Sequence, residues 1–224
     1  MKVSEAIERR ISVRAFRKEA PSREQVAKII ETAIRAPSGG NLQPWRVHVL
    51  AGDALQAMVG DVAQVIAERP RSEKPEYAVY PADLWEPLRT RRFQAGEDLY
   101  ASINIERENK LGRLAQFSNN FRLFGAPVGL FFTLDRRVGP PQWSDMGMFM
   151  QTLMLAAVEA GLDTCAQEAW SQFPVTVGKH LPLEENEMLF SGMALGYRDE
   201  DHPINTLRTR RAGLDEIATF KGFD

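Results

Sequence analysis

The chain has 224 residues, of which 44% are hydrophobic and 26% are charged. These fractions are typical of globular proteins and exclude a disordered chain or a collagen-like repeat. Lysine and arginine together number 28, and aspartate and glutamate number 30, so the net charge is −2. This balance offers no bulk positive charge for binding nucleic acid, and we expect no nucleic-acid partner.

The apolar patterning and the single cysteine indicate a cytoplasmic protein. Cys165 has no partner for an internal disulfide, which fits a reducing compartment. The longest uninterrupted apolar run, residues 153–158, is far shorter than the ~18 residues that span a bilayer, so we expect no membrane partner. No repeat or flexible linker divides the chain, and we expect a single domain over residues 1–224.

The first two predicted elements are a short helix over residues 4–10 and an extended segment over residues 10–16. In the extended segment, polar and apolar residues alternate with a period of two. This alternation predicts that Arg10, Ser12 and Arg14 lie on one side of the segment.

A second helix begins at Ser22, which stands three residues before Gln25 in the spacing of a capping box. Pro37 ends this helix, and residues 38–41 form a loop. The alternating apolar residues of 45–50 then predict a strand.

The middle of the chain is rich in charge, proline and tyrosine, and we expect a lid or insertion at about residues 68–118. Its prolines are expected to break any long helix before about Glu97. Beyond it, apolar runs predict a buried strand over residues 126–132, a buried helix over 148–161 and another strand over 188–197.

Several familiar catalytic patterns are missing from the sequence. The three histidines are scattered, without HExxH, CxxC or paired Cys/His spacing, so we expect no metal site. The sequence contains no GxSxG nucleophile elbow, no GxxxxGK[ST] loop and no GxGxxG motif. Cys165 is more typical of a small core residue than of a nucleophile. We nominate no catalytic side chain.

Three segments carry groups suited to a phosphorylated aromatic cofactor. The two arginines and the serine on one side of residues 10–16 suit a phosphate dianion, although the solvent face of an edge strand has the same pattern. The loop over residues 36–45 allows close backbone approach and presents polar side chains to a ring edge, although ordinary connectors do so too. Small residues over 161–170 let a planar group lie against the backbone, although tight packing also explains them.

Taken together, these segments resemble the nitroreductase family of flavin enzymes, almost from end to end. Arg10-x-Ser12-x-Arg14-x-Phe16 is similar to the family's N-terminal flavin-phosphate motif. The stretch Pro37-Ser38-Gly39 through Asn41-x-Gln43-Pro44-Trp45 is similar to its PSxxNxQPW loop, with Gly39 where a second serine is common.

Two further matches complete the resemblance. Gly161-Leu162-x-Thr164-Cys165 with Gln167-Glu168 resembles the segment under the flavin ring, and Arg208 and Arg211 resemble the C-terminal phosphate contact. Residues 80–113 are the least family-like part of the chain.

The resemblance implies an α+β fold, in which helices flank a central, mainly antiparallel sheet. It also implies an intertwined homodimer in which the C-terminal arm of each subunit wraps around the other, with FMN bound at the interface. Such a dimer would account for the apolar helix over residues 148–161 and for the apolar C-terminal tail.

The resemblance also implies the FMN contacts. Arg10, Ser12 and Arg211 would hold the phosphate, and Arg14 would lie near the pyrimidine end. The loop would reach the ring from the partner chain, and the N–H near Glu168 would donate to flavin N5. The full set of expected cofactor-binding residues is Arg10, Ile11, Ser12, Val13, Arg14, Pro37, Ser38, Gly39, Asn41, Gln43, Gln167, Glu168, Arg208 and Arg211.

The activity implied by the resemblance is an FMN-dependent oxidoreductase that takes hydride from NADH or NADPH and reduces nitroaromatic compounds by a ping-pong mechanism. Related flavin enzymes act on quinones, enoates or halophenols, and a flavin store or sensor without efficient turnover has the same motifs. A non-flavin anion-binding module is a third alternative.

The acceptor is expected to be a small aromatic molecule under a roof formed by residues 77–113. Three arginines in this stretch, Arg89, Arg91 and Arg92, would attract an anionic acceptor, although each also fits a solvated surface. Three aromatic residues are candidates for the pocket wall, although core packing is the better explanation for each. They are Phe121, Phe124 and Trp143.

Overall fold

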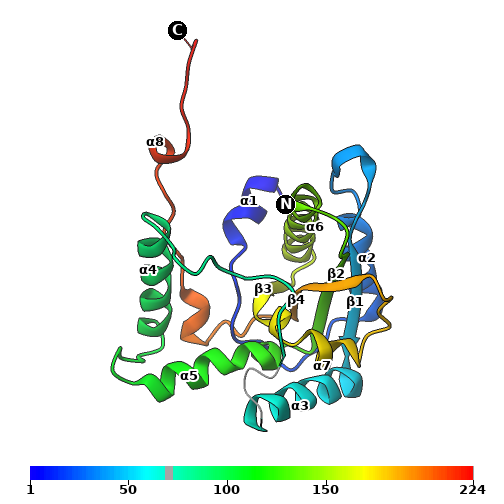
Figure 1. Ribbon diagram of the computed structural model, residues 1–224. Helices are drawn as coiled ribbons and strands as arrows, with labels where there is room; N and C mark the ends of the chain where they lie inside the picture. The colour runs from blue at the N-terminus through cyan, green and yellow to red at the C-terminus, as the bar shows by residue number, and fades with distance from the viewer. Residues whose placement is uncertain (69–72, 224) are drawn as a thin grey trace.

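A four-stranded sheet forms the centre of the computed structural model, which describes residues 1–68 and 73–223 (Figure 1). The strand order is β1-β2-β4-β3, and each neighbouring pair is antiparallel. The expected α+β fold with an antiparallel sheet is therefore confirmed. The strands are β1 (Arg46–Ala51), β2 (Val128–Asp135), β3 (Asp163–Gln167) and β4 (Glu187–Gly196).

Helices cover both faces of this sheet. The α-helices are α1 (Val3–Arg9), α2 (Arg23–Ala33), α3 (Gly52–Glu68), α4 (Leu88–Ala101), α5 (Lys110–Ser118), α6 (Pro140–Glu159), α7 (Pro174–Gly178) and α8 (Leu214–Ile217). The 3-10 helices are η1 (Gly39–Asn41), η2 (Asn119–Gly125), η3 (Glu168–Gln172) and η4 (Pro203–Thr206). Helices α2 and α6 pack on one face of the sheet, and α3 and α7 pack on the other.

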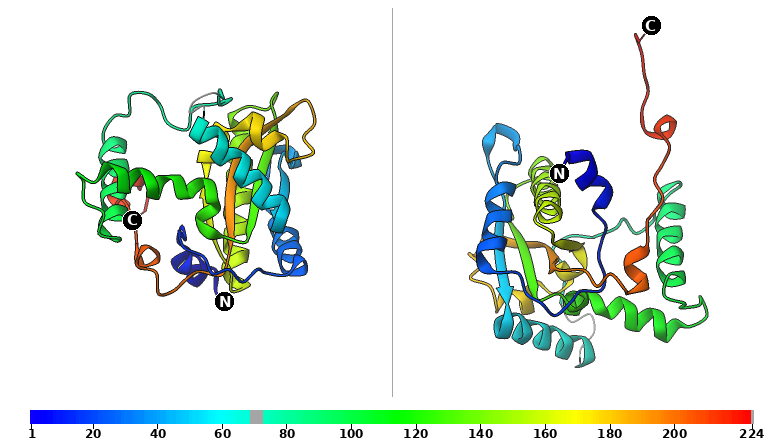
Figure 2. Two further views of the ribbon diagram at one scale, coloured as in Figure 1. Left: turned by 90° about the horizontal axis from the view of Figure 1, so that it is seen from below. Right: turned by 180° about the vertical axis from the view of Figure 1, so that it is seen from behind.

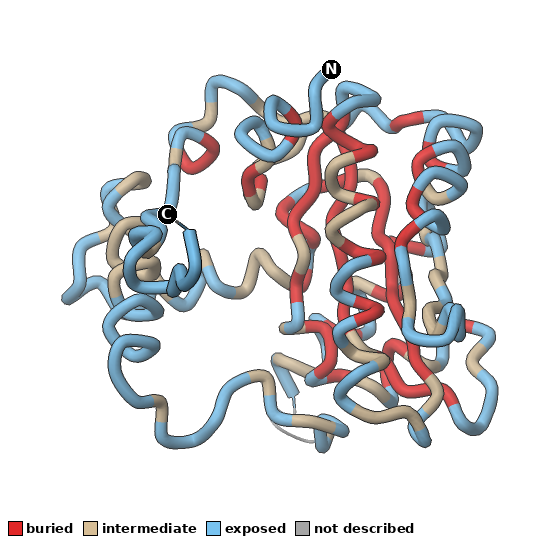
Figure 3. Tube along the Cα trace, turned by 90° about the horizontal axis from the view of Figure 1, so that it is seen from above, coloured by how far each residue is buried: buried red, intermediate tan, exposed pale blue. Residues whose placement is uncertain are grey.

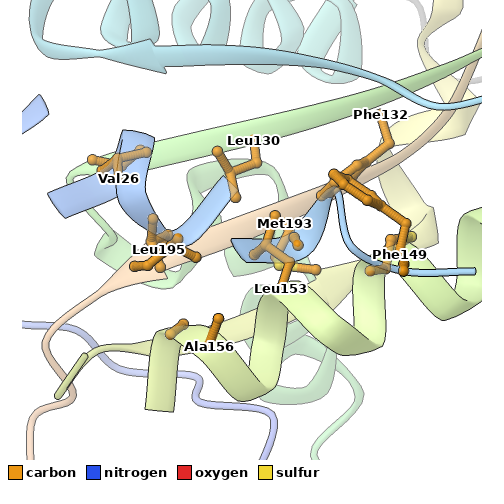
Figure 4. Packing of buried hydrophobic residues seen from close by; sticks show 14 of the residues in the cluster. Val26, Leu130, Phe132, Phe149, Leu153, Ala156, Met193 and Leu195 are labelled. Atoms are coloured by element: carbon orange, nitrogen blue, oxygen red, sulfur yellow. The ribbon is translucent and has the colours of Figure 1, made fainter. Parts of the chain in front are cut away.

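Strand β2 is buried on both of its faces, which explains its continuous apolar sequence. Leu130 and Phe132 point into the cluster formed with α2 and α6, where Phe132 meets Phe149 (Figure 4). Phe131 points the opposite way and packs edge-on against Trp170 at a centroid distance of 5.3 Å. This strand therefore joins the two layers of the core.

A second part of the molecule stands apart from the sheet layers. Helices α4 and α5 contain no buried residue, and the C-terminal tail runs beside α4 (Figures 1 and 2). Two ion pairs join α4 to the tail, Arg91 to Glu216 at 2.8 Å and Arg210 to Asp98 at 3.6 Å. Figure 3 shows α4 and α5 as a mixture of exposed and intermediate residues, in contrast to the buried strands. The lid expected at about residues 68–118 includes residues 69–72, which lie outside the described residues.

Some element boundaries differ from the sequence-based expectation. Helix α4 begins at Leu88 rather than near Glu97, because Pro87 stands at its N-cap, where a missing N–H removes no helical hydrogen bond. Helix α6 begins at Pro140 rather than at residue 148, because prolines are tolerated in a first turn. Helix α3 was not expected, although Leu55, Met58 and Val62 give it a buried face.

No helix within residues 1–68 and 73–223 combines the length and the apolar character needed to cross a membrane.

The close packing of Trp170 against β4 yields a stability prediction. A Cβ added at Gly192 would lie 2.4 Å from the Trp170 ring, whereas one added at Gly60, on the exposed side of α3, meets nothing within 4 Å. Gly192→Ala should lower the free energy of unfolding by about 1–3 kcal/mol through overpacking. Gly60→Ala should raise it by up to about 1 kcal/mol through helix propensity. Urea titration measures both changes, and equal stability of the two variants would contradict this packing.

Candidate functional site

The N-terminal extended segment, residues 10–16, is fixed to the edge strand β3 and the end of β4. The N–H of Val13 donates to the carbonyl of Thr164 at 3.0 Å, and Ser12 forms an isolated bridge with Thr164. Ile11 and Val13 are buried, whereas Arg10, Ser12 and Arg14 are half-buried. The predicted alternation is confirmed, and it turns two guanidinium groups and a hydroxyl to the same side.

Asn205 holds the backbone at Arg14, and sequence reasoning missed it. Its amide oxygen accepts from the N–H of Arg14 at 2.9 Å. Its amide nitrogen donates to the carbonyls of Ala15 and Asp199, each at 2.8 Å. Asn205 is 7% exposed, so its side chain serves this clamp rather than solvent. It lies 190 residues from the segment it holds, and no local pattern signals such a contact.

Arg208 and Arg211 of the C-terminal tail lie near Arg10, and Arg14 lies on the same side of the segment as Arg10. Burial, followed by the positive charges of Arg211 and Arg208, lowers the pKa of Arg10. Arg14 donates to the carbonyl of Ser12 at 3.2 Å, and Arg208 and Arg211 likewise donate to nearby backbone carbonyls at 2.9–3.0 Å. Within the described ranges, none of the four forms an ion pair with a carboxylate. Like charges brought together without counter-charges fit a bound dianion such as a phosphate.

Cys165 lies beneath the arginines and does not have the character of a nucleophile. Its side chain is buried, and desolvation raises the pKa of its thiol to about 11 despite the nearby charges of Arg14 and Arg10. The expectation that it is a small core residue is confirmed.

Gln167 and Glu168 mark the point where β3 ends and η3 begins. The buried amide of Gln167 donates to the carbonyl of Asn120 at 2.7 Å, so it ties η2 to the sheet. Its side-chain oxygen is buried, without a partner among the described residues. Glu168 is exposed, and its N–H opens η3, where the first N–H groups of a helix have no intrahelical acceptor.

The turn that Gln167 holds is strained. Leu123 and Phe124 have φ values of 51° and 54°, in the left-handed region that bulky side chains rarely adopt. Each such residue costs roughly 1–3 kcal/mol. Burial of Leu123 helps to hold this geometry. The result is that the Phe124 ring lies 6.0 Å from the guanidinium carbon of Arg14.

The loop over residues 37–43 is anchored to α6 by a buried carboxylate. Asp145 accepts from the N–H of Gly39 at 3.2 Å. Within the loop, the N–H of Gln43 donates to the hydroxyl of Ser38 at 3.0 Å, and the amide of Gln43 donates to the carbonyl of Asn41. A Cβ at Gly39 would lie 4.0 Å from Asp145, so the serine common at this place in the family would also fit.

One chain does not bring all the predicted site residues together. Helix α1 and the segment that follows it lie on one side of α6, whereas the loop between α2 and β1 lies on the other (Figures 1 and 2). The residues on the first side are Arg10, Ile11, Ser12, Val13, Arg14, Arg208 and Arg211. The residues on the second side are Pro37, Ser38, Gly39, Asn41 and Gln43.

A hollow of about 420 Å³ lies between α4, α5 and the Arg14 segment. Phe124 lines it and is also buried in the core cluster that holds Phe121, whereas Trp143 is partly buried against the other core cluster. Phe121 packs against Phe173 at a centroid distance of 5.0 Å, and Trp143 packs against Tyr77 at 5.4 Å. The expectation of core packing is confirmed for all three residues, and Phe124 in addition borders the hollow.

The model of a known family matches residues 7–197, and its description is "Nitroreductase family". The chain belongs to the nitroreductase family. Family membership accounts for the shared motifs in the N-terminal segment and in the loop before β1.

Named relatives cover nearly the whole chain. A 4-nitrobenzoate reductase of Pseudomonas putida is 39% identical over 218 residues, which are 96% of this chain and 93% of the relative. A nitrobenzene nitroreductase of Ectopseudomonas oleovorans is 35% identical over 218 residues, which are 97% and 96% of the two chains.

The solved structures give the same result. The FMN- and NADPH-dependent nitroreductase NfnB of Sphingopyxis sp. strain HMH is 48% identical, with a TM-score of 0.97 over 100% of both chains. The FMN-dependent nitroreductase NfnB of Mycobacterium smegmatis, solved in complex with NADPH, is 31% identical, with a TM-score of 0.91 over 98% of this chain and 100% of that chain.

The burial of Cys165 predicts its reactivity. With a pKa of about 11, only roughly a thousandth of the thiol is ionised at pH 8, and the side chain is also inaccessible. Native protein should therefore react with a chromogenic disulfide reagent at least 100-fold more slowly than protein unfolded in guanidinium chloride. Rapid labelling of the native protein would show that the thiol is accessible and ionised.

Proposed function

We propose that this protein is an FMN-dependent oxidoreductase that uses NADH or NADPH to reduce nitroaromatic compounds. The observation that carries the proposal is the cluster of Arg10, Arg14, Arg208 and Arg211, gathered without carboxylate partners in the described residues. The named relatives are reductases of nitrobenzoate and nitrobenzene, and the similar solved structures are FMN-dependent nitroreductases. These names favour nitroarenes over quinones, enoates, halophenols or a flavin store.

The residues present fit FMN. The arginine cluster supplies donors for a phosphate dianion, and a strained turn places an aromatic ring beside Arg14. Within the described chain, the buried oxygens of Thr164 and Gln167 next to this segment lack hydrogen-bond partners. In the proposal, Arg10, Ser12, Arg208 and Arg211 hold the phosphate, and Arg14 lies near the pyrimidine end.

When bound, FMN supplies the transfer of hydride from the nicotinamide to the acceptor. The chain's own residues would bind the cofactor and orient it. Arg14 places a positive charge near the ring, and the N–H of Glu168 offers a donor at the end of β3. Ping-pong kinetics are part of the proposal, with donor and acceptor using the same site in turn, and no side chain is assigned as a catalytic base.

A homodimer with exchanged C-terminal arms is also part of the proposal. It is supported by the separation of the arginine cluster from the Ser38 loop across α6, because a second chain can supply the loop that the first chain holds at a distance. The tail also exposes apolar side chains, with Ile217 69% and Phe223 82% exposed, and a partner chain would cover them.

Two further expectations stay part of the proposal. Residues 68–118 are proposed as a lid, and the cytoplasm is proposed as the location of the protein.

The phosphate assignment predicts which arginine matters for FMN. Arg211→Ala should purify largely colourless, because it removes a charge-assisted hydrogen bond of about 1.5–3 kcal/mol. Arg210→Ala is the matched control, since Arg210 is the neighbouring residue but pairs with Asp98 at 3.6 Å. Flavin absorbance per chain is the measurement. Equal yellow colour in both variants would contradict the assignment.

A shared site predicts complementation between two defective chains. One variant is Arg211→Ala, and the other is Gly39→Trp, which blocks the loop without touching the arginines. Each variant alone should hold little FMN, whereas a co-expressed heterodimer, isolated by two different tags, should regain one of its two sites. Size-exclusion chromatography with light scattering checks that all species are dimers. A heterodimer as colourless as the single variants would contradict a site built from two chains.

A further inference from the structure

The arginines of the outlying helix α4 differ in the groups that their guanidiniums contact. Arg89 donates to the carbonyl of Leu84 at 2.8 Å, and Arg91 pairs with Glu216 at 2.8 Å. These contacts tie both side chains to the rest of the chain. Neither guanidinium lines the hollow beside Arg14.

Arg92 instead contacts an aromatic ring. Its guanidinium carbon lies 4.2 Å from the centroid of the Tyr80 ring, and within the described residues it forms no ion pair with a carboxylate. Asp83 and Glu97 line a separate hollow that Arg92 also borders. Glu97 forms its ion pair with Arg113, at 2.5 Å. The Tyr80 ring thus holds the Arg92 guanidinium in place without neutralising its charge.

The hollow beside Arg92 combines positive charge with aromatic walls. Among the described residues that line it are Arg14, Tyr80, Arg92, Tyr100, Phe117 and Phe124, and none of the described lining residues is an aspartate or a glutamate. Its two charged lining residues are Arg14 and Arg92. Its volume of about 420 Å³ exceeds the cavity of about 150 Å³ that takes a benzene ring, so a substituted ring fits.

We infer that Arg92 is a specificity-determining residue that selects nitroaromatic acceptors carrying a carboxylate. This inference rests on the proposed function, in which Arg14 belongs to the cofactor and Arg92 is left to face the acceptor. A planar guanidinium donates to both oxygens of a carboxylate at once, and the aromatic walls accept the ring that carries it. The positive charge at the hollow also draws anions towards it from solution.

Two substrates of the same shape isolate the effect of charge. 4-Nitrobenzoate and 4-nitrobenzamide differ only in the carboxylate and the neutral amide, so their nitro groups and rings make the same contacts. Any preference for the benzoate that depends on Arg92 therefore reports the guanidinium–carboxylate contact.

The test compares kcat/KM for both substrates in the wild type, Arg92→Gln, Arg92→Lys and Arg89→Gln. Arg92→Gln should lower kcat/KM for 4-nitrobenzoate by about 10- to 100-fold, mainly through KM, and leave 4-nitrobenzamide within about twofold. Arg92→Lys should recover part of the loss, because it keeps the charge. Arg89→Gln is the matched control one turn away in α4 and should behave as wild type.

A binding measurement without NAD(P)H gives an independent readout. In calorimetric titration, benzoate should bind the flavin-loaded wild type at least 10-fold more tightly than Arg92→Gln, and added salt should weaken the wild-type binding. Equal benzoate affinity in the two proteins, or an equal loss of activity on both nitro compounds, would overturn the inference. Loss of flavin from Arg92→Gln would also overturn it, because Arg92 would then serve the cofactor.

The inference and the proposed function fail in different ways. A wild-type protein that contains FMN but reduces neither nitro compound contradicts the proposed function, while benzoate binding still decides the role of Arg92. A wild-type protein that reduces both compounds without preference contradicts only the inference.

Discussion

The proposed cofactor site depends on a cluster of like charges beside the edge strand β3. Burial of Arg10, followed by repulsion from Arg211 and Arg208, disfavours its charged form and lowers its pKa. The fold imposes this clustering through backbone contacts, the pairing of Val13 with Thr164 and the clamp of Asn205 on Arg14. A bound phosphate would relieve the repulsion, so cofactor binding should stabilise the whole N-terminal segment.

A second constraint is the position of α6, which lies between the two groups of predicted contacts. Its buried face fills the core, and its Asp145 fixes the loop at Gly39. The same helix therefore contributes to stability and separates the loop from the arginine cluster. In the proposed dimer, α6 keeps apart two groups of residues of one chain that contribute to two different sites.

The elements that could be predicted from sequence carry local signals. The capping box of Ser22 and Gln25 is confirmed by reciprocal hydrogen bonds of 2.8 and 3.2 Å, and the apolar run of β2 is confirmed as a buried strand. What was missed depends on contacts between distant parts of the chain. The clamp of Asn205 and the strain at Phe124, which is held through Gln167, arise only when the sheet has formed. The individual flavin contacts stay predictions.

The most direct test of the flavin assignment is an absorbance spectrum of the purified protein, recorded anaerobically before and after addition of NADPH. We expect flavin bands that bleach when the nucleotide is added and return when a nitroarene is mixed in. A colourless protein that also fails to take up added FMN would contradict the assignment of the arginine cluster to a flavin phosphate.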